Sequence, residues 1–238
     1  MILAANQPYF CPFPGFFYKI HLCDVFVILD EVQFPQGTTW ITRNRFKNDQ
    51  GALWLTVPVW KKGLGLQQIS DVKICHEGRW HKKHVESLRS AYVHAPYFGE
   101  HLDFVKEIFS PNHQTILQCN LEVIRYLARR LEIGTKIVLL SELDIKARGN
   151  LLLVKICKSL GASKFLAQSA AAKYIDEEQF KAAAIRLDYF KYPSPIYPQL
   201  WGDFIPNLSA FDLIFNCGPK ARDILIGSAS GRVKESPY

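Results

Sequence analysis

Short apolar runs and longer amphipathic stretches alternate along this chain. The apolar runs predict strands over residues 2–5, 25–29, 53–59, 69–74, 136–140, 164–167 and 187–192. A short helix over residues 15–22, with Phe16, Phe17 and Ile20 on its apolar side, separates the first two strands. A strand, a crossover helix and a second strand predict a parallel pair in a right-handed unit.

The middle of the chain, residues 78–133, has the helical period instead. Trp80, His84, Leu88 and Tyr92 recur at every fourth position and so share one helix face. Further helices are predicted over residues 101–109, 115–131, 151–160, 176–184, 209–216 and 219–226. The pattern predicts an α/β fold: a Rossmann-like, mostly parallel sheet with a central helical insertion, in one domain over residues 1–228 before a polar tail at 229–238.

Composition narrows the class of protein. A chain of 238 residues with 48% hydrophobic content can bury a sizeable core. No apolar run approaches the roughly 18 residues of a membrane span, and the N-terminus lacks the pattern of a secretory signal. None of the six cysteines forms a C-x-x-C pair, which predicts free thiols and a cytoplasmic protein.

The net charge of +7 favours anionic partners, such as nucleotide diphosphates, nucleic acid or anionic lipid. A basic solvated surface with no partner is the simpler interpretation. The basic side chains cluster in two places, at Arg43, Arg45 and Lys47 and at Arg79, Lys82 and Lys83.

Polar groups follow the first two predicted strands. Gln7, Pro8 and Tyr9 follow the first strand in an aromatic, proline-rich loop, and Asp30, Glu31 and Gln33 end the second. Ligands of an open α/β sheet bind outside the carboxyl ends of its strands. The prediction is therefore one pocket lined by Gln7, Tyr9, Asp30, Glu31, Arg43 and Arg45, in which a carboxylate acts as general base and the arginines hold phosphate. The alternative is that Asp30 and Glu31 cap a strand end and pair with these arginines.

Other polar side chains have both a functional and a structural interpretation. His84 is either a base or a buried, hydrogen-bonded histidine. Asn207 and Ser209 either present polar groups to a ligand or cap the following helix. Metal binding is disfavoured because Cys75, His76, His81 and His84 fit no standard zinc spacing. The absence of a G-x-S-x-G elbow and of a P-loop weakens hydrolase and ATPase interpretations.

Collinear motifs resemble the WbqC-like protein family of bacteria. They are QPYFCPFPGFF from residue 7, DVFVILDEVQF from 24, WITRNR from 40, WHKKH from 80, AYVHAPYF from 91 and FIPNLS from 204, with FN at 215–216. The chain departs from the family in one loop, where Ala170, Ala171 and Ala172 replace a glycine-rich sequence. Alanine adopts a positive φ less readily than glycine, so this loop puts the family's substrate in question for this chain.

The resemblance implies a cytoplasmic transferase of surface-polysaccharide (O-antigen type) biosynthesis. It would move an acyl or aminoacyl group, glycyl for example, to an aminodeoxy sugar nucleotide; the motifs identify no cofactor and no metal. The catalytic residues it implies are Asp30, Glu31 and His84. The substrate-binding residues are Gln7, Pro8, Tyr9, Gln33, Arg43, Asn44, Arg45, Tyr92, Ser169, Asn207 and Ser209.

Two other classes of protein stay open. A nucleotidyltransferase-like enzyme shares the order of elements at the N-terminus, but its H-x-G-H element is missing. A non-catalytic protein that binds a nucleotide sugar or nucleic acid fits the basic charge. A nucleotide-linked sugar or another anionic small molecule is the favoured partner, and nucleic acid is disfavoured. Steeply salt-dependent binding of nucleic acid would reverse that preference.

Overall fold

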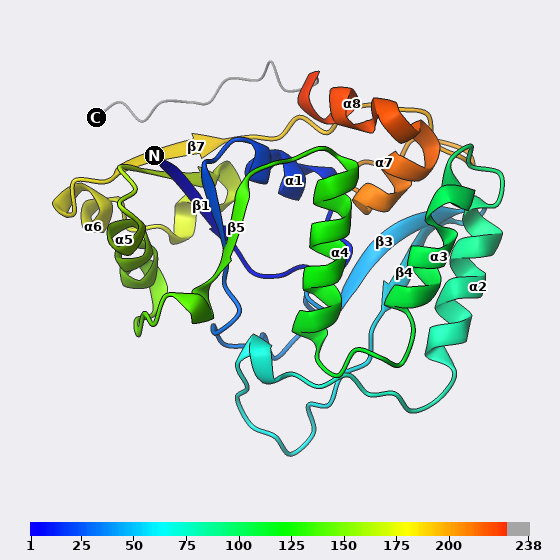
Figure 1. Cartoon of the computed structure of the whole chain (residues 1–238), viewed down its shortest axis with the longest axis horizontal. Helices are drawn as coiled ribbons and strands as arrows, with labels where there is room; N and C mark the ends of the chain where they lie inside the picture. The colour runs from blue at the N-terminus through cyan, green and yellow to red at the C-terminus, as the bar shows by residue number, and fades with distance from the viewer. Residues whose placement is uncertain (228–238) are drawn as a thin grey trace.

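The computed structural model describes residues 1–227, and a five-stranded parallel sheet organises them (Figure 1). Its strands are β1 (Ile2–Asn6), β2 (Val25–Ile28), β5 (Lys136–Leu139), β6 (Lys164–Gln168) and β7 (Arg186–Phe190). They lie in the order β5-β2-β1-β6-β7. The chain builds outward from β1 to β5 and then continues on the other side of β1, so the strand order reverses between β1 and β6. This arrangement confirms the predicted α/β fold with a Rossmann-like sheet.

Side chains alternate across β1 and β2, and each face of the sheet is covered by helices. Ala4 and Phe26 pack on α1 (Pro14–His21), whose Phe16, Phe17 and Ile20 are buried as the sequence predicted. The larger core on this face continues to α4 (Ile116–Arg130), α7 (Ala210–Cys217) and α8 (Ala221–Gly227). The opposite face packs on α5 (Gly149–Leu160) and α6 (Glu177–Ala182). Because both faces are covered, the inner strands β2, β1 and β6 carry polar side chains only at their ends.

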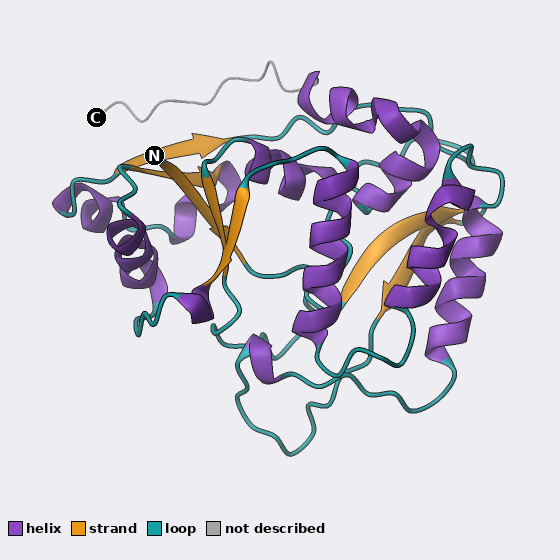
Figure 2. Cartoon of the chain, in the orientation of Figure 1, coloured by secondary structure: helices purple, strands orange, loops and turns teal. Residues whose placement is uncertain are grey.

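A second layer of structure stands beside the parallel sheet. The strands β3 (Arg43–Asn48) and β4 (Gly51–Thr56) form an antiparallel hairpin, drawn apart from the sheet in Figure 2. The helices α2 (Trp80–Tyr92) and α3 (Phe98–Ile108) lie next to it, and α4 lies between the hairpin and the sheet (Figure 1). These three helices, α2 to α4, occupy the segment in which the sequence predicts a helical insertion.

Two parts of the strand prediction were wrong. No strand was expected over residues 43–48, because five of those six side chains are charged or amide groups, yet they form β3. A strand was expected over residues 69–74, where the chain instead forms the 3-10 turn η1 (Ile69–Asp71). In this turn Ile69 and Ser70 donate backbone hydrogen bonds to the carbonyls of Val32 and Asp30, so the segment pairs with a loop.

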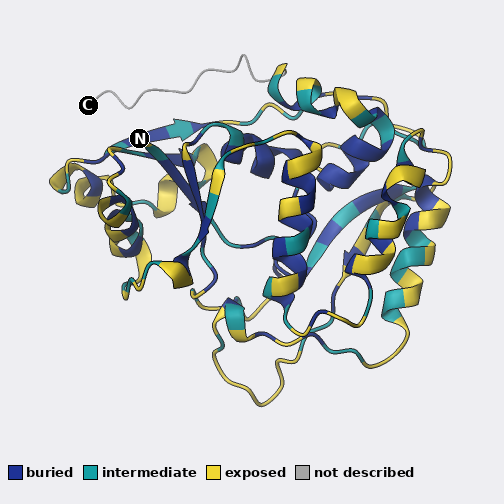
Figure 3. Ribbon diagram, viewed as in Figure 1, coloured by how far each residue is buried: buried dark blue, intermediate teal, exposed yellow. Residues whose placement is uncertain are grey.

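Local signals placed the helix ends well. Ser209 caps α7 by accepting a hydrogen bond from Phe211 N at 3.3 Å, and Figure 3 shows that α7 is almost wholly buried. Gly161 ends α5 in the left-handed conformation, with a φ of 68°. All six cysteines are free thiols, and five of them are buried. The polar tail predicted at 229–238 lies outside the described residues.

Candidate functional site

The carboxyl edge of the sheet brings several of the predicted residues to one side of the molecule. Gln7 follows β1, Asp30 and Glu31 follow β2, and Ser169 follows β6. Since β1 and β6 are neighbours, Gln7 and Ser169 flank the point at which the strand order reverses. In doubly wound sheets this switch point is the usual place for a ligand.

The alanine-rich loop lies at this edge and is not strained. Residues Ser169–Tyr174 form the 3-10 turn η3, in which no alanine has a positive φ. Ser169 is exposed, and its hydroxyl donates to the carbonyl of Phe190 at 2.9 Å. The chain therefore closes this loop without the glycines that the family resemblance led us to expect.

A buried lysine that the sequence did not single out also lies at the end of β1. Lys19 comes from α1, is 7% exposed, and donates from Nζ to the carbonyl of Ala5 at 2.7 Å. Asn6 Oδ1 is 3.5 Å from the same nitrogen. Burial lowers the pKa of Lys19 to about 8. The sequence did contain one signal for this burial: Lys19 lies next to Ile20 and three residues after Phe16, both of which face the core.

The two adjacent carboxylates after β2 have different surroundings. Asp30 is 1% exposed, and its carboxylate accepts hydrogen bonds from Ser141 N at 3.1 Å and from Ser141 Oγ at 2.6 Å. These bonds tie the end of β2 to the turn after β5. Glu31 is exposed and makes no hydrogen bond or ion pair within residues 1–227. Of the two, Glu31 is the carboxylate that a ligand can reach.

Glu31 lines a pocket of about 680 Å³ at the ends of β2 and β5. The polar part of its wall carries Gln33, Gln67 and Gln68, and its apolar part carries Val32, Leu66, Leu140, Ile145 and Leu152. Lys146 and Arg148, just before α5, add two exposed cations whose side chains have no hydrogen-bond or ion-pair partner within residues 1–227. The pocket therefore combines a free carboxylate, free cations and an apolar surface.

The hairpin holds the predicted basic cluster, at a different place from this pocket. Arg43 stacks its guanidinium 3.8 Å from the centre of the Trp54 ring, and Trp54 is 42% exposed. Arg45 donates from Nη2 to the carbonyls of Pro206 and Asn207, at 3.2 and 3.3 Å. Neither arginine forms an ion pair with Asp30 or Glu31, so the alternative of strand-end salt bridges does not hold.

Other predicted residues support the loop that follows β1. Asn44 is 1% exposed and donates from Nδ2 to the carbonyls of Phe10 and Cys11, both at 2.9 Å. Pro8 is buried, and its carbonyl accepts from Asn120 Nδ2 at 2.8 Å. Buried amides of this kind satisfy the carbonyls of an apolar loop that has no strand partner. Asn44 and Pro8 therefore help to fix the conformation of the loop that follows β1.

Tyr92 is fully buried in a polar network that the sequence did not predict. Its hydroxyl donates to Asp212 at 2.7 Å and accepts from Lys47 N at 2.9 Å, while Tyr197 donates to the same carboxylate at 2.8 Å. Burial raises the pKa of Asp212, and the two tyrosine hydroxyls act in the opposite direction. Lys47 Nζ bonds Gln199 and the carbonyl of Asp203. This network joins α2, α7 and the hairpin.

His84 lies among aromatic rings near the N-terminal end of α2. Its Nε2 donates to the carbonyl of Thr56 at 2.9 Å, and its ring packs edge-on to Trp80 and Phe109. Burial lowers the pKa of His84. The neighbouring rings of His76 and His81 are joined by a 3.0 Å hydrogen bond. Among residues 1–227, no three His, Cys, Asp or Glu side chains converge as metal ligands would.

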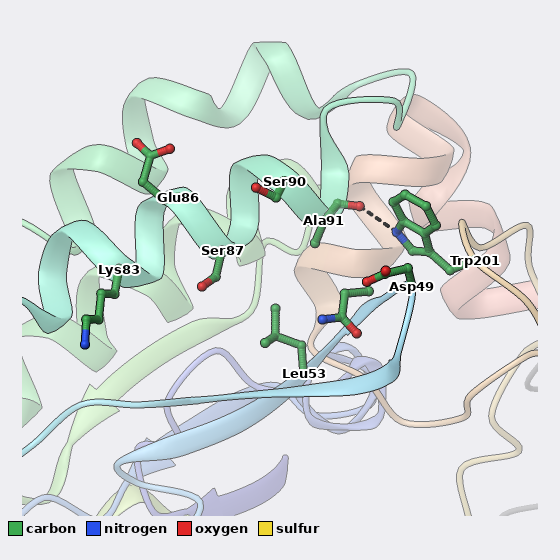
Figure 4. A pocket seen from close by; sticks show the side chains of 9 residues that line it. Asp49, Leu53, Lys83, Glu86, Ser87, Ser90, Ala91 and Trp201 are labelled. Carbon is green, nitrogen blue, oxygen red and sulfur yellow. Dashed lines mark hydrogen bonds between the residues drawn. The ribbon is translucent and has the colours of Figure 1, made fainter.

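A second, more open pocket of about 620 Å³ lies between the hairpin and α2 (Figure 4). Trp201 closes one end of it and donates from its indole nitrogen to the carbonyl of Ala91 at 2.8 Å. Ser87 and Lys83 extend from α2 along its length (Figure 4). None of the predicted site residues lines it.

The six residues predicted to line one pocket do not share one. Glu31 and Gln33 line the pocket at the ends of β2 and β5, whereas Gln7, Tyr9, Arg43 and Arg45 do not. Asn207 lies beside the hairpin, because its carbonyl accepts from Arg45 and its side chain accepts from Ser194 at 2.6 Å. Strand ends converge on one edge as expected, but the chain after β2 leaves that edge before it forms the hairpin.

The doubly wound parallel sheet, with its strand order reversed between β1 and β6, defines a Rossmann-like α/β protein. The chain belongs to the WbqC-like protein family, whose sequence profile matches residues 7–224. It is 32% identical over 226 residues to the "Uncharacterized protein Rv1507c" of Mycobacterium tuberculosis (strain ATCC 25618 / H37Rv), covering 94% of this chain and 96% of that protein. No solved structure matches the chain. No helix within residues 1–227 has the length and apolar character needed to cross a bilayer.

Proposed function

We propose that this protein is a cytoplasmic transferase of bacterial surface-polysaccharide (O-antigen type) biosynthesis. It moves an acyl or aminoacyl group, such as glycyl, from an activated carrier to the amine of an aminodeoxy sugar nucleotide. Membership of the WbqC-like family supports the class of protein. The observation that carries the assignment of the site is the pocket at the ends of β2 and β5, where the side chains of Glu31, Lys146 and Arg148 have no partner among residues 1–227.

Each part of this pocket matches a part of such a substrate. Its volume of about 680 Å³ lies in the range of small-molecule sites. The two cations suit a diphosphate, the glutamines suit sugar hydroxyls, and the apolar wall suits the flat face of a base or an acyl chain. Glu31 is then the carboxylate nearest to a reacting amine.

Amide formation requires a neutral amine and an acceptor for its proton. The amine nitrogen attacks the acyl carbonyl carbon, the new C–N bond forms, and the bond from that carbon to the carrier breaks. Glu31 takes the proton from the nitrogen and passes it to the departing carrier group. Asp30 is not placed for this step, because both of its oxygens already accept hydrogen bonds from Ser141.

The test has a binding arm and a turnover arm. Calorimetry with an aminodeoxy sugar nucleotide should show a loss of affinity of tenfold or more in the Lys146→Ala/Arg148→Ala double variant. The Arg79→Ala/Lys82→Ala variant removes the same charges from exposed positions at the start of α2 and should bind like the wild type. Equal affinity in both double variants would remove the pocket from the proposal.

For turnover, mass spectrometry follows the amide product with a panel of activated acyl and aminoacyl donors. Glu31→Gln should lower the rate roughly 10²-fold, the usual scale for loss of a general base. Glu107→Gln, at an exposed position on α3, is the matched control and should not change it. Substrate binding with undiminished turnover in Glu31→Gln would exclude Glu31 as the base. Binding with no turnover for any donor would favour a non-catalytic nucleotide-sugar protein.

A further inference from the structure

Lys19 is a buried cation at the switch point of the sheet. Its ammonium contacts the carbonyl of Ala5 and the side-chain oxygen of Asn6, the last two residues of β1. Neither partner is charged, and no carboxylate within residues 1–227 forms an ion pair with Lys19. Two of the three donor positions of the ammonium are occupied, which leaves one available.

An isolated buried charge is costly, and proteins usually pair it or replace it with an apolar side chain. The helix that carries Lys19 would be better packed with methionine or leucine there, since its neighbours Phe16, Phe17 and Ile20 are all in the core. The burial that lowers the pKa of this lysine expresses the same cost. The bond to Ala5 satisfies a strand carbonyl beyond the last residue of β1 that pairs with β6, but a neutral donor could do the same without a buried charge.

The place of Lys19 in the fold suggests what its charge is for. It lies at the carboxyl end of β1, where the strand order reverses and where ligands of doubly wound sheets bind. Asn6 contacts the ammonium, and the half-buried Gln7 and the exposed Ser169 follow the neighbouring strands β1 and β6 at the same edge of the sheet. An anion there would meet the third N–H of the ammonium and would supply the missing negative charge.

We propose that Lys19 is the cationic anchor of an anion-binding subsite at the end of β1, which takes the phosphate or carboxylate group of a small-molecule ligand. The subsite is separate from the pocket that contains Lys146 and Arg148, and it does not depend on the proposed transfer reaction. Ligand binding pairs the buried ammonium, so the same charge that weakens the free protein strengthens the complex.

The experiment measures anion affinity in the full chain, in a Lys146→Ala/Arg148→Ala background that removes the two cations of the pocket at the ends of β2 and β5. Inorganic phosphate and acetate are titrated separately by calorimetry at pH 7, so that the two arms distinguish a phosphate from a carboxylate ligand. Lys19→Met keeps the length of the side chain and removes its charge. We expect binding of at least one anion, and a loss of affinity of tenfold or more in Lys19→Met.

Stability measurements separate this role from a structural one. The unliganded Lys19→Met variant should melt no lower than its parent, and phosphate or acetate should no longer raise its melting temperature. Lys19→Gln, also neutral, replaces it if the methionine variant fails to fold. The proposal is overturned if neither anion binds the parent at 20 mM, or if a folded neutral variant keeps the parent's affinity. Loss of nucleotide-sugar binding at Lys146 and Arg148 alone would leave this result unaffected.

Discussion

Replacing Lys19 by methionine should change how the stability of the protein depends on pH. The pKa of Lys19 falls from 10.5 to about 8 because burial disfavours the ammonium. Between these two values the unfolded chain binds more protons than the folded one, so this residue makes stability rise with pH. The full span corresponds to about 3 kcal/mol, at roughly 1.4 kcal/mol for each pKa unit. Between pH 7.5 and 9.5, the linkage relation gives a rise of about 2 kcal/mol in the free energy of unfolding from this residue.

The assay is urea unfolding of both proteins at pH 7.5, 8.5 and 9.5, compared as a difference. Comparison is needed because burial raises the pKa of five thiols, which makes stability fall with pH in the same window. Those thiols are Cys11, Cys23, Cys119, Cys157 and Cys217, and their effect largely cancels between the two proteins. Cys23 couples to Lys19, so both proteins carry Cys23→Ala.

At pH 7.5 the methionine variant should have its greatest relative advantage, because the wild type then carries a charged, buried Lys19. That advantage should shrink by about 2 kcal/mol at pH 9.5, as Lys19 loses its proton in the folded state. A difference that stays constant to within about 0.5 kcal/mol would mean that Lys19 keeps an ordinary pKa. The ammonium would then be hydrated or paired, and the argument from an uncompensated buried charge would fail.

Two further predictions concern buried carboxylates. In Asp30→Asn only one side-chain oxygen remains to accept from Ser141 N and Oγ, so the free energy of unfolding in urea should fall by about 2 kcal/mol. Turnover per folded molecule should stay near the wild-type value. A stable variant with roughly 10²-fold lower turnover would restore Asp30 as the base. In Asp212→Asn the amide cannot accept from both Tyr92 and Tyr197, and the charge near Lys47 is lost, so unfolding free energy should fall by about 3 kcal/mol. An unfolding midpoint within error of the wild type would show that this network contributes little.

Much of the fold could be read along the chain. The apolar runs around Phe26 and Phe165 predicted inner strands of a parallel sheet, because strands covered on both faces have no polar side. The fourfold repeat from Trp80 to Tyr92 predicted α2, and Ser209 marked the start of α7. Hydrophobic periodicity and helix caps depend on residues a few positions apart, so they can be recognised in the sequence without the tertiary structure.

The candidate site was only partly predictable. Motifs identified Glu31 and Gln33 as site residues, and the structure places both in one pocket. Lys146 and Arg148, about 115 residues later in the chain, line the same pocket, and no local pattern connects them to Glu31. Lys19 was missed because a lysine on a short amphipathic helix normally lies in solvent.

The sequence by itself determined the class of fold, the parallel sheet, the family and the edge at which polar groups gather. Only the tertiary structure decided that adjacent carboxylates have opposite surroundings, with Asp30 bonded to Ser141 and Glu31 open to a pocket. It also decided that Tyr92 lies buried against Asp212 and that Lys19 ends at the carbonyl of Ala5. The physical reason is that burial and pairing depend on partners more than a hundred residues away for the first two groups, and on how α1 packs on β1 for the third. The periodicity of the sequence predicts which face of a helix or strand a residue occupies, whereas tertiary packing determines which residues that face contacts.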